Sequence, residues 1–157
     1  MKTKVIHILS HSPAPNAYNA DIPNLGSSNP SDSKYFVKIP RKPYIAGFFQ
    51  NDWHAQVARE IRNRNNDYEI ECWRPYRGLD KTYSKNIKGI IHKIFPSFYF
   101  EINSKSTSRS NSSEYSGSLI RELEKEIKKK KIIIHLHGMG GILFNRISSK
   151  FGSTPII

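Results

Sequence analysis

A short segment near the C-terminus places histidines and glycines directly after an apolar run. His135 and His137 lie two residues apart, and Gly138, Gly140 and Gly141 follow them. Imidazole donates hydrogen bonds and exchanges protons near neutral pH, and glycines let a ligand approach the backbone closely. We predict that His137 is catalytic and that His135 and the three glycines bind substrate. The alternative remains open that the glycines only tighten a turn and that His135 is a hydrogen-bonded core residue.

A strand and a helix are expected on either side of this segment. Residues 132–136 form an apolar run typical of a buried strand, and Leu143, Ile147 and Phe151 then recur at the spacing of a helix. If the strand is regular, both histidines share one side of it. The helix directs its free amide groups and positive dipole end at whatever binds there, which suits phosphate or sugar oxygens.

The beginning of the chain supplies a second loop that should meet the first. Residues 4–9 are an apolar run, interrupted by His7 and too short for a signal peptide, and Ser10 and His11 follow. In an open parallel sheet, ligands bind beyond the carboxyl ends of the strands. We therefore predict that Ser10 and His11 also contribute to the substrate site.

Helical and strand patterns alternate along the rest of the chain, which predicts one α/β domain over residues 1–157. We expect a Rossmann-like parallel sheet flanked by helices. The patterns are a helix from Asn51 with Trp53, Val57 and Ile61 on one face, a strand over Tyr68–Trp73, a strand over residues 89–95 ending at Pro96, and a helix carrying Leu119, Leu123 and Ile127.

Two stretches, about residues 12–44 and 104–118, have the composition of mobile loops. The first is rich in Pro, Asn, Ser and Asp and includes a strand-like piece at residues 35–39, and the second has eight serines in fifteen residues. Residues 155–157 resemble the beginning of another buried strand, so we expect the domain to be truncated at its C-terminus.

The composition restricts partners and compartment. A formal net charge of +12 favours anionic partners. Because the basic stretches lack an RNA-recognition pattern or a recognition helix, no specific nucleic acid is expected. The lysines at 128–131 match the negative end of a helix dipole. Cys72 is the only cysteine, which rules out an intrachain disulfide and favours a buried thiol in a reducing cytoplasm.

Several cofactor motifs are absent from the sequence. No G-x-G-x-x-G follows the first apolar run, and no P-loop is present, so neither a dinucleotide nor another cofactor is expected. The six histidines show no H-E-x-x-H spacing. His135 and His137 could chelate an ion, but no partnering carboxylate is evident, and we expect no metal site.

Residues 132–157, IIIHLHGMGGILFNRISSKFGSTPII, resemble the fourth strand, H-x-H-G loop, helix and fifth strand of the N-terminal domain of GT-B glycosyltransferases, in particular the retaining "group 1" family. The segments KVIHILS and GFFQNDWHAQVAREIRNR are similar to the family's first strand and first helix. The resemblance implies an enzyme that moves a sugar from a nucleotide-sugar donor to a glycan or lipid-linked acceptor. It implies that the N-terminal domain mainly holds the acceptor and that His137 lies near the reacting centre.

Two departures from the family pattern limit this expectation. Ser10-His11-Ser12-Pro13 stands where the family commonly has a glycine pair, and the donor-binding C-terminal domain with its E-x7-E signature is missing. The chain alone is therefore expected to be inactive, in the cytoplasm or peripherally on an anionic membrane surface. Two alternatives remain: a basic domain that binds anionic membrane or nucleic acid, and an α/β-hydrolase fragment. The hydrolase alternative lacks the G-x-S-x-G nucleophile motif.

Overall fold

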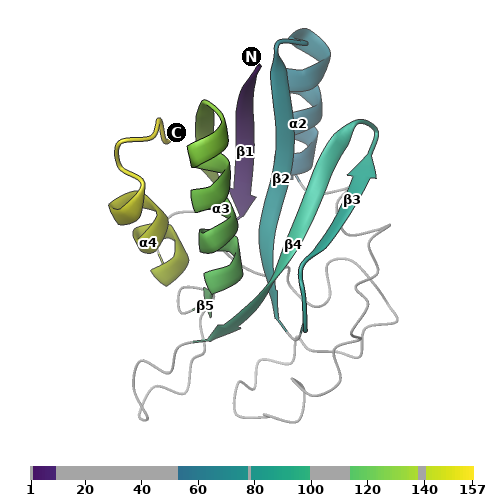
Figure 1. The fold of residues 1–157 in the computed structure, drawn as a ribbon. Helices are drawn as coiled ribbons and strands as arrows, with labels where there is room; N and C mark the ends of the chain where they lie inside the picture. The colour runs from purple at the N-terminus through teal and green to yellow at the C-terminus, as the bar shows by residue number, and fades with distance from the viewer. Residues whose placement is uncertain (1, 10–52, 78, 100–113, 138–140) are drawn as a thin grey trace, which may run out of the picture.

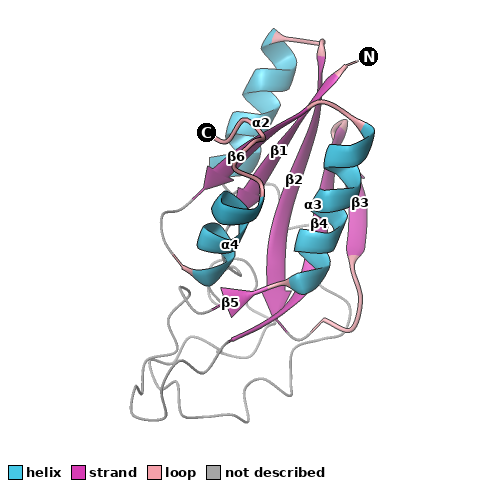
Figure 2. Cartoon of the chain, turned by 60° about the vertical axis from the view of Figure 1, so that its left-hand side comes forward, coloured by secondary structure: helices cyan, strands magenta, loops and turns pink. Residues whose placement is uncertain are grey.

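The structure is a computed structural model that describes residues 2–9, 53–77, 79–99, 114–137 and 141–157. These residues form a single small α/β domain in which helices lie on both faces of a six-stranded mixed sheet (Figures 1 and 2). The strands are β1 (Thr3–Leu9), β2 (Tyr68–Arg77), β3 (Tyr83–Ile87), β4 (Ile90–Tyr99), β5 (Glu114–Tyr115) and β6 (Ile132–His137), and the helices are α2 (Trp53–Arg64), α3 (Gly117–Lys129) and α4 (Ile142–Lys150).

The sheet runs in the order β3-β4-β2-β1-β6, and β5 pairs with β4 outside this path. Strands β4, β2, β1 and β6 are mutually parallel, whereas β3 and β5 are antiparallel to β4. The predicted α/β class is confirmed, but the sheet is mixed and not wholly parallel. Beyond β6, Ile156 forms a parallel bridge with Ile134, so the strand expected over residues 155–157 is present as a single bridge.

A tight hairpin between β3 and β4 makes the sheet mixed. Its two turn residues, Lys88 and Gly89, have φ angles of 51° and 81°, the left-handed conformation that matches the twist of a two-residue hairpin. The Gly89 N–H donates to Oδ1 of Asn86 at 2.9 Å. The sequence offered no Asn-Gly or Asp-Gly pair here, and the hairpin was not predicted.

Strand β4 continues through Pro96, where the sequence pattern predicted its end. Pro96 lies between the stretch that pairs with β3, which reaches Ile94, and the stretch that pairs with β5, which begins at Phe98. A residue without an N–H is tolerated where one side of a strand lacks a ladder partner. The Pro96 carbonyl accepts a hydrogen bond of 2.7 Å from the hydroxyl of Ser116.

Helix α3 begins inside the stretch that was predicted to be a serine-rich loop. Ser116 is its N-cap, and its side chain accepts a hydrogen bond of 3.3 Å from the Leu119 N–H. A serine at this position satisfies one of the free amides of the first turn. Residues 114–118 are therefore strand, cap and first helical turn, and the loop prediction is wrong for them. Residues 100–113 and 10–52, which contain the rest of both predicted loops and the strand-like piece, lie outside the described residues.

Helices α3 and α4 pack on the face of the sheet to which Ile6 and Ile8 point (Figure 2). As predicted, Lys128 and Lys129 occupy the last turn of α3. The core on this face also contains the predicted helical positions of α3 and α4, together with two aromatic residues of the sheet; its members include Trp73, Phe95, Leu119, Leu123, Leu143, Ile147 and Phe151.

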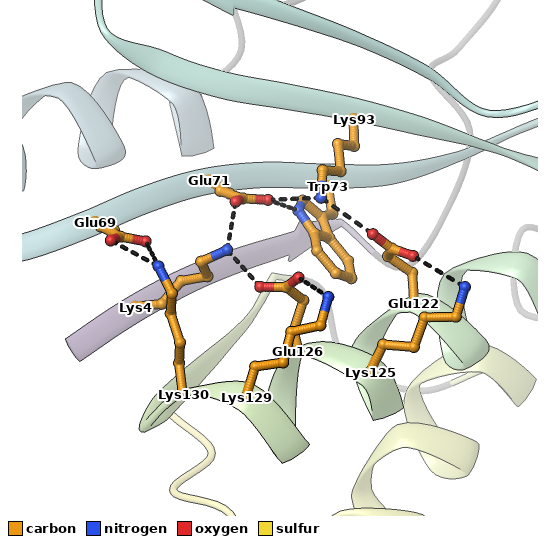
Figure 3. A network of polar contacts seen from close by, with 10 residues as sticks. All are labelled: Lys4, Glu69, Glu71, Trp73, Lys93, Glu122, Lys125, Glu126, Lys129 and Lys130. Carbon is orange, nitrogen blue, oxygen red and sulfur yellow. Dashed lines mark hydrogen bonds and ion pairs between the residues drawn. The ribbon is translucent and has the colours of Figure 1, made fainter. Parts of the chain in front are cut away.

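A network of buried charges ties α3 to this same face (Figure 3). Lys4 on β1 lies between two carboxylates, donating to Oε1 of Glu71 at 2.7 Å and to Oε2 of Glu126 on α3. The Trp73 indole N–H donates to the other oxygen of Glu71 at 2.7 Å, and Lys93 lies 3.3 Å from that oxygen. Burial alone would lower the pKa of Lys4, but its hydrogen bonds to the two carboxylates outweigh burial and raise the pKa above 10.5.

Helix α2 covers the opposite face, and small side chains bring it close to the strands. Ala55 and Ala58 are fully buried, and Ala58 packs against Val5, Ile70, Cys72 and Ile90. Of the predicted apolar face, Ile61 packs against this cluster, Val57 is partly buried and belongs to no core cluster of the described residues, and the Trp53 side chain lies outside the described residues. Ala58 forms this contact, and its small side chain lets the helix backbone approach the sheet. Cys72 is a buried cysteine outside any disulfide, as predicted.

Within the described ranges, no helix combines the length and the apolar character that crossing a bilayer requires.

Candidate functional site

Three histidines line up across the sheet on the face that α2 covers. His7 on β1 is the register partner of His135 on β6 and of Cys72 on β2, and Cys72 is in turn the partner of His92 on β4. Register partners in a parallel sheet project to the same face. The strands therefore place these side chains in one row: His135, His7, Cys72 and His92.

Further basic side chains extend this row toward the carboxyl ends of the strands. His137 follows His135 by two residues on β6, and Arg74 follows Cys72 by two residues on β2, so each shares its neighbour's face. The ring of His137 lies 4.1 Å from that of His135, 5.1 Å from that of His7 and 5.8 Å from that of His54 on α2, measured between centroids. Five of the six histidines thus belong to this assembly, which we call the histidine cluster: His7, His54, His92, His135 and His137.

A direct hydrogen bond joins two rings of the cluster. Nδ1 of His7 lies 2.9 Å from Nε2 of His137, so one of these nitrogens carries a hydrogen and donates the hydrogen bond that the other accepts. His7 has no exposed surface, and its second nitrogen, Nε2, has no hydrogen-bond partner among the described residues. A buried polar atom left without a partner costs about 1–3 kcal/mol. This atom therefore marks a position where a bound group would be stabilising.

Burial keeps the cluster uncharged at neutral pH. Burial first, then the neighbouring His135 and His137, lowers the pKa of His7 to about 3. Burial and His135 lower the pKa of His137 to about 4, and burial also lowers the pKa of His135. At pH 7 these three rings are therefore neutral and present lone pairs, which is the form in which imidazole binds metals and accepts hydrogen bonds.

Two more histidines lie near arginines on the same face. Burial, followed by the charge of Arg74 and then the other imidazoles, lowers the pKa of His54 to about 2. Burial, followed by Arg59 and Arg74, lowers the pKa of His92 to about 4. The neighbours that act on these two pKa values are thus cationic or imidazole groups, which disfavour a further positive charge.

The structure places only part of the predicted site. His135 and His137 share one side of a regular strand, as predicted, with His135 partly buried and His137 1% exposed. Gly141 is the N-cap of α4 with a φ of 90°, a left-handed conformation that suits glycine. Ser10, His11, Gly138 and Gly140 lie outside the described residues. With a pKa of about 4, His137 is neutral near pH 7. Its predicted role in proton exchange stays a prediction.

Sequence reasoning missed four members of this region. His7 was noticed only as an interruption of the first apolar run, and His54, Arg74 and His92 were not singled out at all. One signal was available for His54, which precedes the buried Ala58 by four residues and so shares its stripe of the helix. For the others no local signal exists, because their proximity arises from the pairing of strands distant in sequence.

Three of the histidines satisfy a stricter geometric condition. His7, His135 and His137 each offer a ring nitrogen, and these three atoms all lie within 4.8 Å of one another. Imidazole nitrogen is a common ligand for transition metals. From the sequence, only the pair on β6 could chelate an ion and no metal site was expected; the third nitrogen comes from His7 on the neighbouring strand.

The fold and the cluster define an α/β domain in which three neutral imidazoles, those of His7, His135 and His137, lie near the carboxyl ends of β1 and β6. Strands β1 and β6 are adjacent there, and the helices α2 and α4 that come next in the chain pack on opposite faces. Such a point of divergence is where open α/β sheets bind ligands. Comparisons with protein-family models, curated proteins and solved structures find no match for this chain.

Proposed function

We propose that this chain is the Rossmann-like, acceptor-binding N-terminal domain of a GT-B glycosyltransferase. When only the parallel strands are numbered along the chain, β1, β2, β4, β6 and the Ile156 bridge lie in the spatial order 3-2-1-4-5. This order supports a Rossmann-like fold. The hairpin strand β3 then extends the edge of the sheet beyond β4.

The position of His137 is the observation that carries the proposal. His137 ends β6, touches His7 of β1 through the 2.9 Å hydrogen bond, and precedes the N-terminus of α4 by a few residues. In this proposal its neutral imidazole forms a hydrogen bond with a hydroxyl of the acceptor sugar near the reacting centre. The free amides of α4 hold further oxygens. The nucleotide-sugar donor is held by a second domain, so the 157 residues alone transfer no sugar.

A binding experiment tests this function. Imidazole and amide NMR signals of the chain are followed during titration with a panel of glycans and lipid-linked oligosaccharides. We expect an acceptor to shift the signals of His137 and Gly141 but not those of Lys85 on the distant strand β3. The variant His137→Gln should lose the response, and His92→Gln, altered at another buried cluster position, should keep it. Absence of any response, or turnover of a nucleotide sugar by the purified chain, would contradict the proposal.

We also propose that the domain works in the cytoplasm, at an anionic membrane face where lipid-linked acceptors are found. The support is the net charge of +12 and the single, buried cysteine. Sedimentation with phosphatidylglycerol vesicles tests the membrane part. We expect binding that weakens steeply between low and physiological salt. Equal recovery with neutral phosphatidylcholine vesicles would contradict it.

A further inference from the structure

We propose that His7, His135 and His137 form a binding site for a divalent transition-metal ion, with Zn²⁺ as its best-fitting occupant. The inference does not depend on sugar transfer, because it uses only the geometry of three side chains. These side chains come from two adjacent parallel strands and point to the same face of the sheet. No carboxylate is needed, since three imidazoles alone form the protein part of known zinc sites.

The distances are close to those that a metal requires. Zinc binds imidazole nitrogen at about 2.0–2.1 Å, so two nitrogens of a tetrahedral site lie about 3.4 Å apart. One ring nitrogen from each of the three histidines lies within 4.8 Å of those of the other two. Rotations of the rings that move the farthest nitrogens by about 1 Å bring them within this range. The parallel pairing of His7 with His135 holds the two strands in register.

The burial of the three rings supports a bound ion in two ways. It leaves one ring nitrogen without a partner among the described residues, and it leaves one ring accessible to an ion from solvent. His7 and His137 are almost fully buried, and Nε2 of His7 has no hydrogen-bond partner among the described residues. A metal ion would lie between the ring nitrogens of His7, His135 and His137. His135 is only partly buried, so its side of the cluster is open to an incoming ion.

The ligand set also selects the class of ion. Neutral imidazoles favour Zn²⁺, Cu²⁺ or Ni²⁺, whereas Mg²⁺ and Ca²⁺ prefer carboxylate and carbonyl oxygens. Three protein ligands leave the fourth tetrahedral position to water or to another ligand. An ion here would lie at the carboxyl edge of β1 and β6.

Calorimetric titration of the untagged, chelator-treated chain with ZnCl₂ at pH 7.5 tests the proposal. We expect one ion per chain, and CoCl₂ should produce the visible absorption of tetrahedral cobalt. The variant His135→Gln should weaken zinc binding 10-fold to 100-fold or more. The matched control His92→Gln removes another buried imidazole of the same row and should bind zinc as the unaltered chain does. Circular dichroism confirms that each variant is folded.

X-ray absorption at the zinc edge supplies a readout that does not depend on any variant. We expect nitrogen neighbours at about 2.0 Å with the outer-shell scattering of imidazole rings. The proposal is overturned by a lack of saturable zinc binding at one ion per chain. It is equally overturned by zinc binding that His135→Gln leaves unchanged, or by a spectrum without imidazole scattering.

Discussion

On the α3 face of the sheet, Lys4 is buried between two carboxylates, whereas on the α2 face His7 is buried between two other imidazoles. Lys4 hydrogen-bonds Glu71 and Glu126, and Glu71 also receives the Trp73 indole N–H. His7 shares one hydrogen bond with His137, and the ring of His135 lies 4.9 Å away between centroids. One strand, β1, thus carries both kinds of buried polar residue on its two sides.

This difference separates a structural role from a binding role. In the α3-side network the buried charges of Lys4, Glu71 and Glu126 each have an opposite charge within hydrogen-bonding distance, so this part is complete without any ligand. In the histidine cluster, the nitrogen Nε2 of His7 has no partner in the described part of the chain. The network should therefore matter most for stability, and the cluster most for binding.

Removing the central carboxylate of the network should have the largest effect on stability. We expect Glu71→Ala to lower the free energy of unfolding by about 3–5 kcal/mol, because Lys4 then keeps only one of its two carboxylate partners inside the fold. Urea denaturation at pH 7.5 measures this. The control is Glu60→Ala, which breaks the exposed pair with Arg64 and should cost about 0.5 kcal/mol or less. A loss below about 1 kcal/mol for Glu71→Ala would mean that the network is not structural.

The two faces should lose stability in different pH windows. The pKa of His92 is about 4 in the folded chain, against 6.5 as its ordinary value. Between these values the unfolded chain binds a proton at His92 that the folded chain does not, so stability falls as the pH falls below 6.5. For Glu126, burial would raise the pKa, but the hydrogen bond from Lys4 outweighs it and lowers the pKa below 4.5. Its contribution is therefore lost only in more acidic solution.

Denaturation at pH 6.5 and pH 5 measures the first window. His92 faces Arg59 on α2 and Arg74 on β2, both of which remain charged throughout this range. The variant His92→Gln should lose about 2 kcal/mol less than the unaltered chain over this interval, at about 1.4 kcal/mol per pH unit. An identical pH dependence for the two proteins would show that His92 becomes protonated within the fold.

The sequence predicted the elements well and their assembly only in part. The apolar runs around Ile6 and Ile134 and the spacing of Leu119 and Leu123 predicted strands and a helix, because burial on a regular element leaves a periodic pattern. The β3–β4 hairpin was missed because Lys88 adopts a positive φ, which is uncommon for lysine and cannot be predicted from its residue type.

The residues of the candidate site that are close in sequence were predicted, and those brought together from distant parts of the chain were missed. His135 and His137 could be identified because they lie two residues apart on one strand. His7 lies 130 residues from His137 along the chain, and only the parallel pairing of β1 with β6 brings them together. No periodicity within a single segment contains that information.

At the edge of the α3-side network, Lys93 should have a moderate effect. It is 3.3 Å from carboxylate oxygens of both Glu71 and Glu122, and its ammonium lies 4.9 Å from the centroid of a Trp73 ring. Because Lys93 is partly exposed, we expect Lys93→Met to cost about 1 kcal/mol in urea denaturation. A loss above about 3 kcal/mol would place it among the central charges of the network.

The smallest effect on stability is expected at the edge of the histidine cluster. In metal-free solution His135→Gln should change the free energy of unfolding by less than about 0.5 kcal/mol, because the side chain is only partly buried. In the presence of zinc the unaltered chain should become more stable and this variant should not. Equal stabilisation of both proteins by zinc would remove the proposed distinction between the two faces.

The measurement that tests this account most directly is an anomalous difference map from crystals of the chain grown with zinc, collected on both sides of the zinc absorption edge. The account predicts one strong peak within coordinating distance of the ring nitrogens of His7, His135 and His137, and none beside Lys4 and Glu71. A map without a peak among these three imidazoles, or with its main peak elsewhere in the chain, would contradict it.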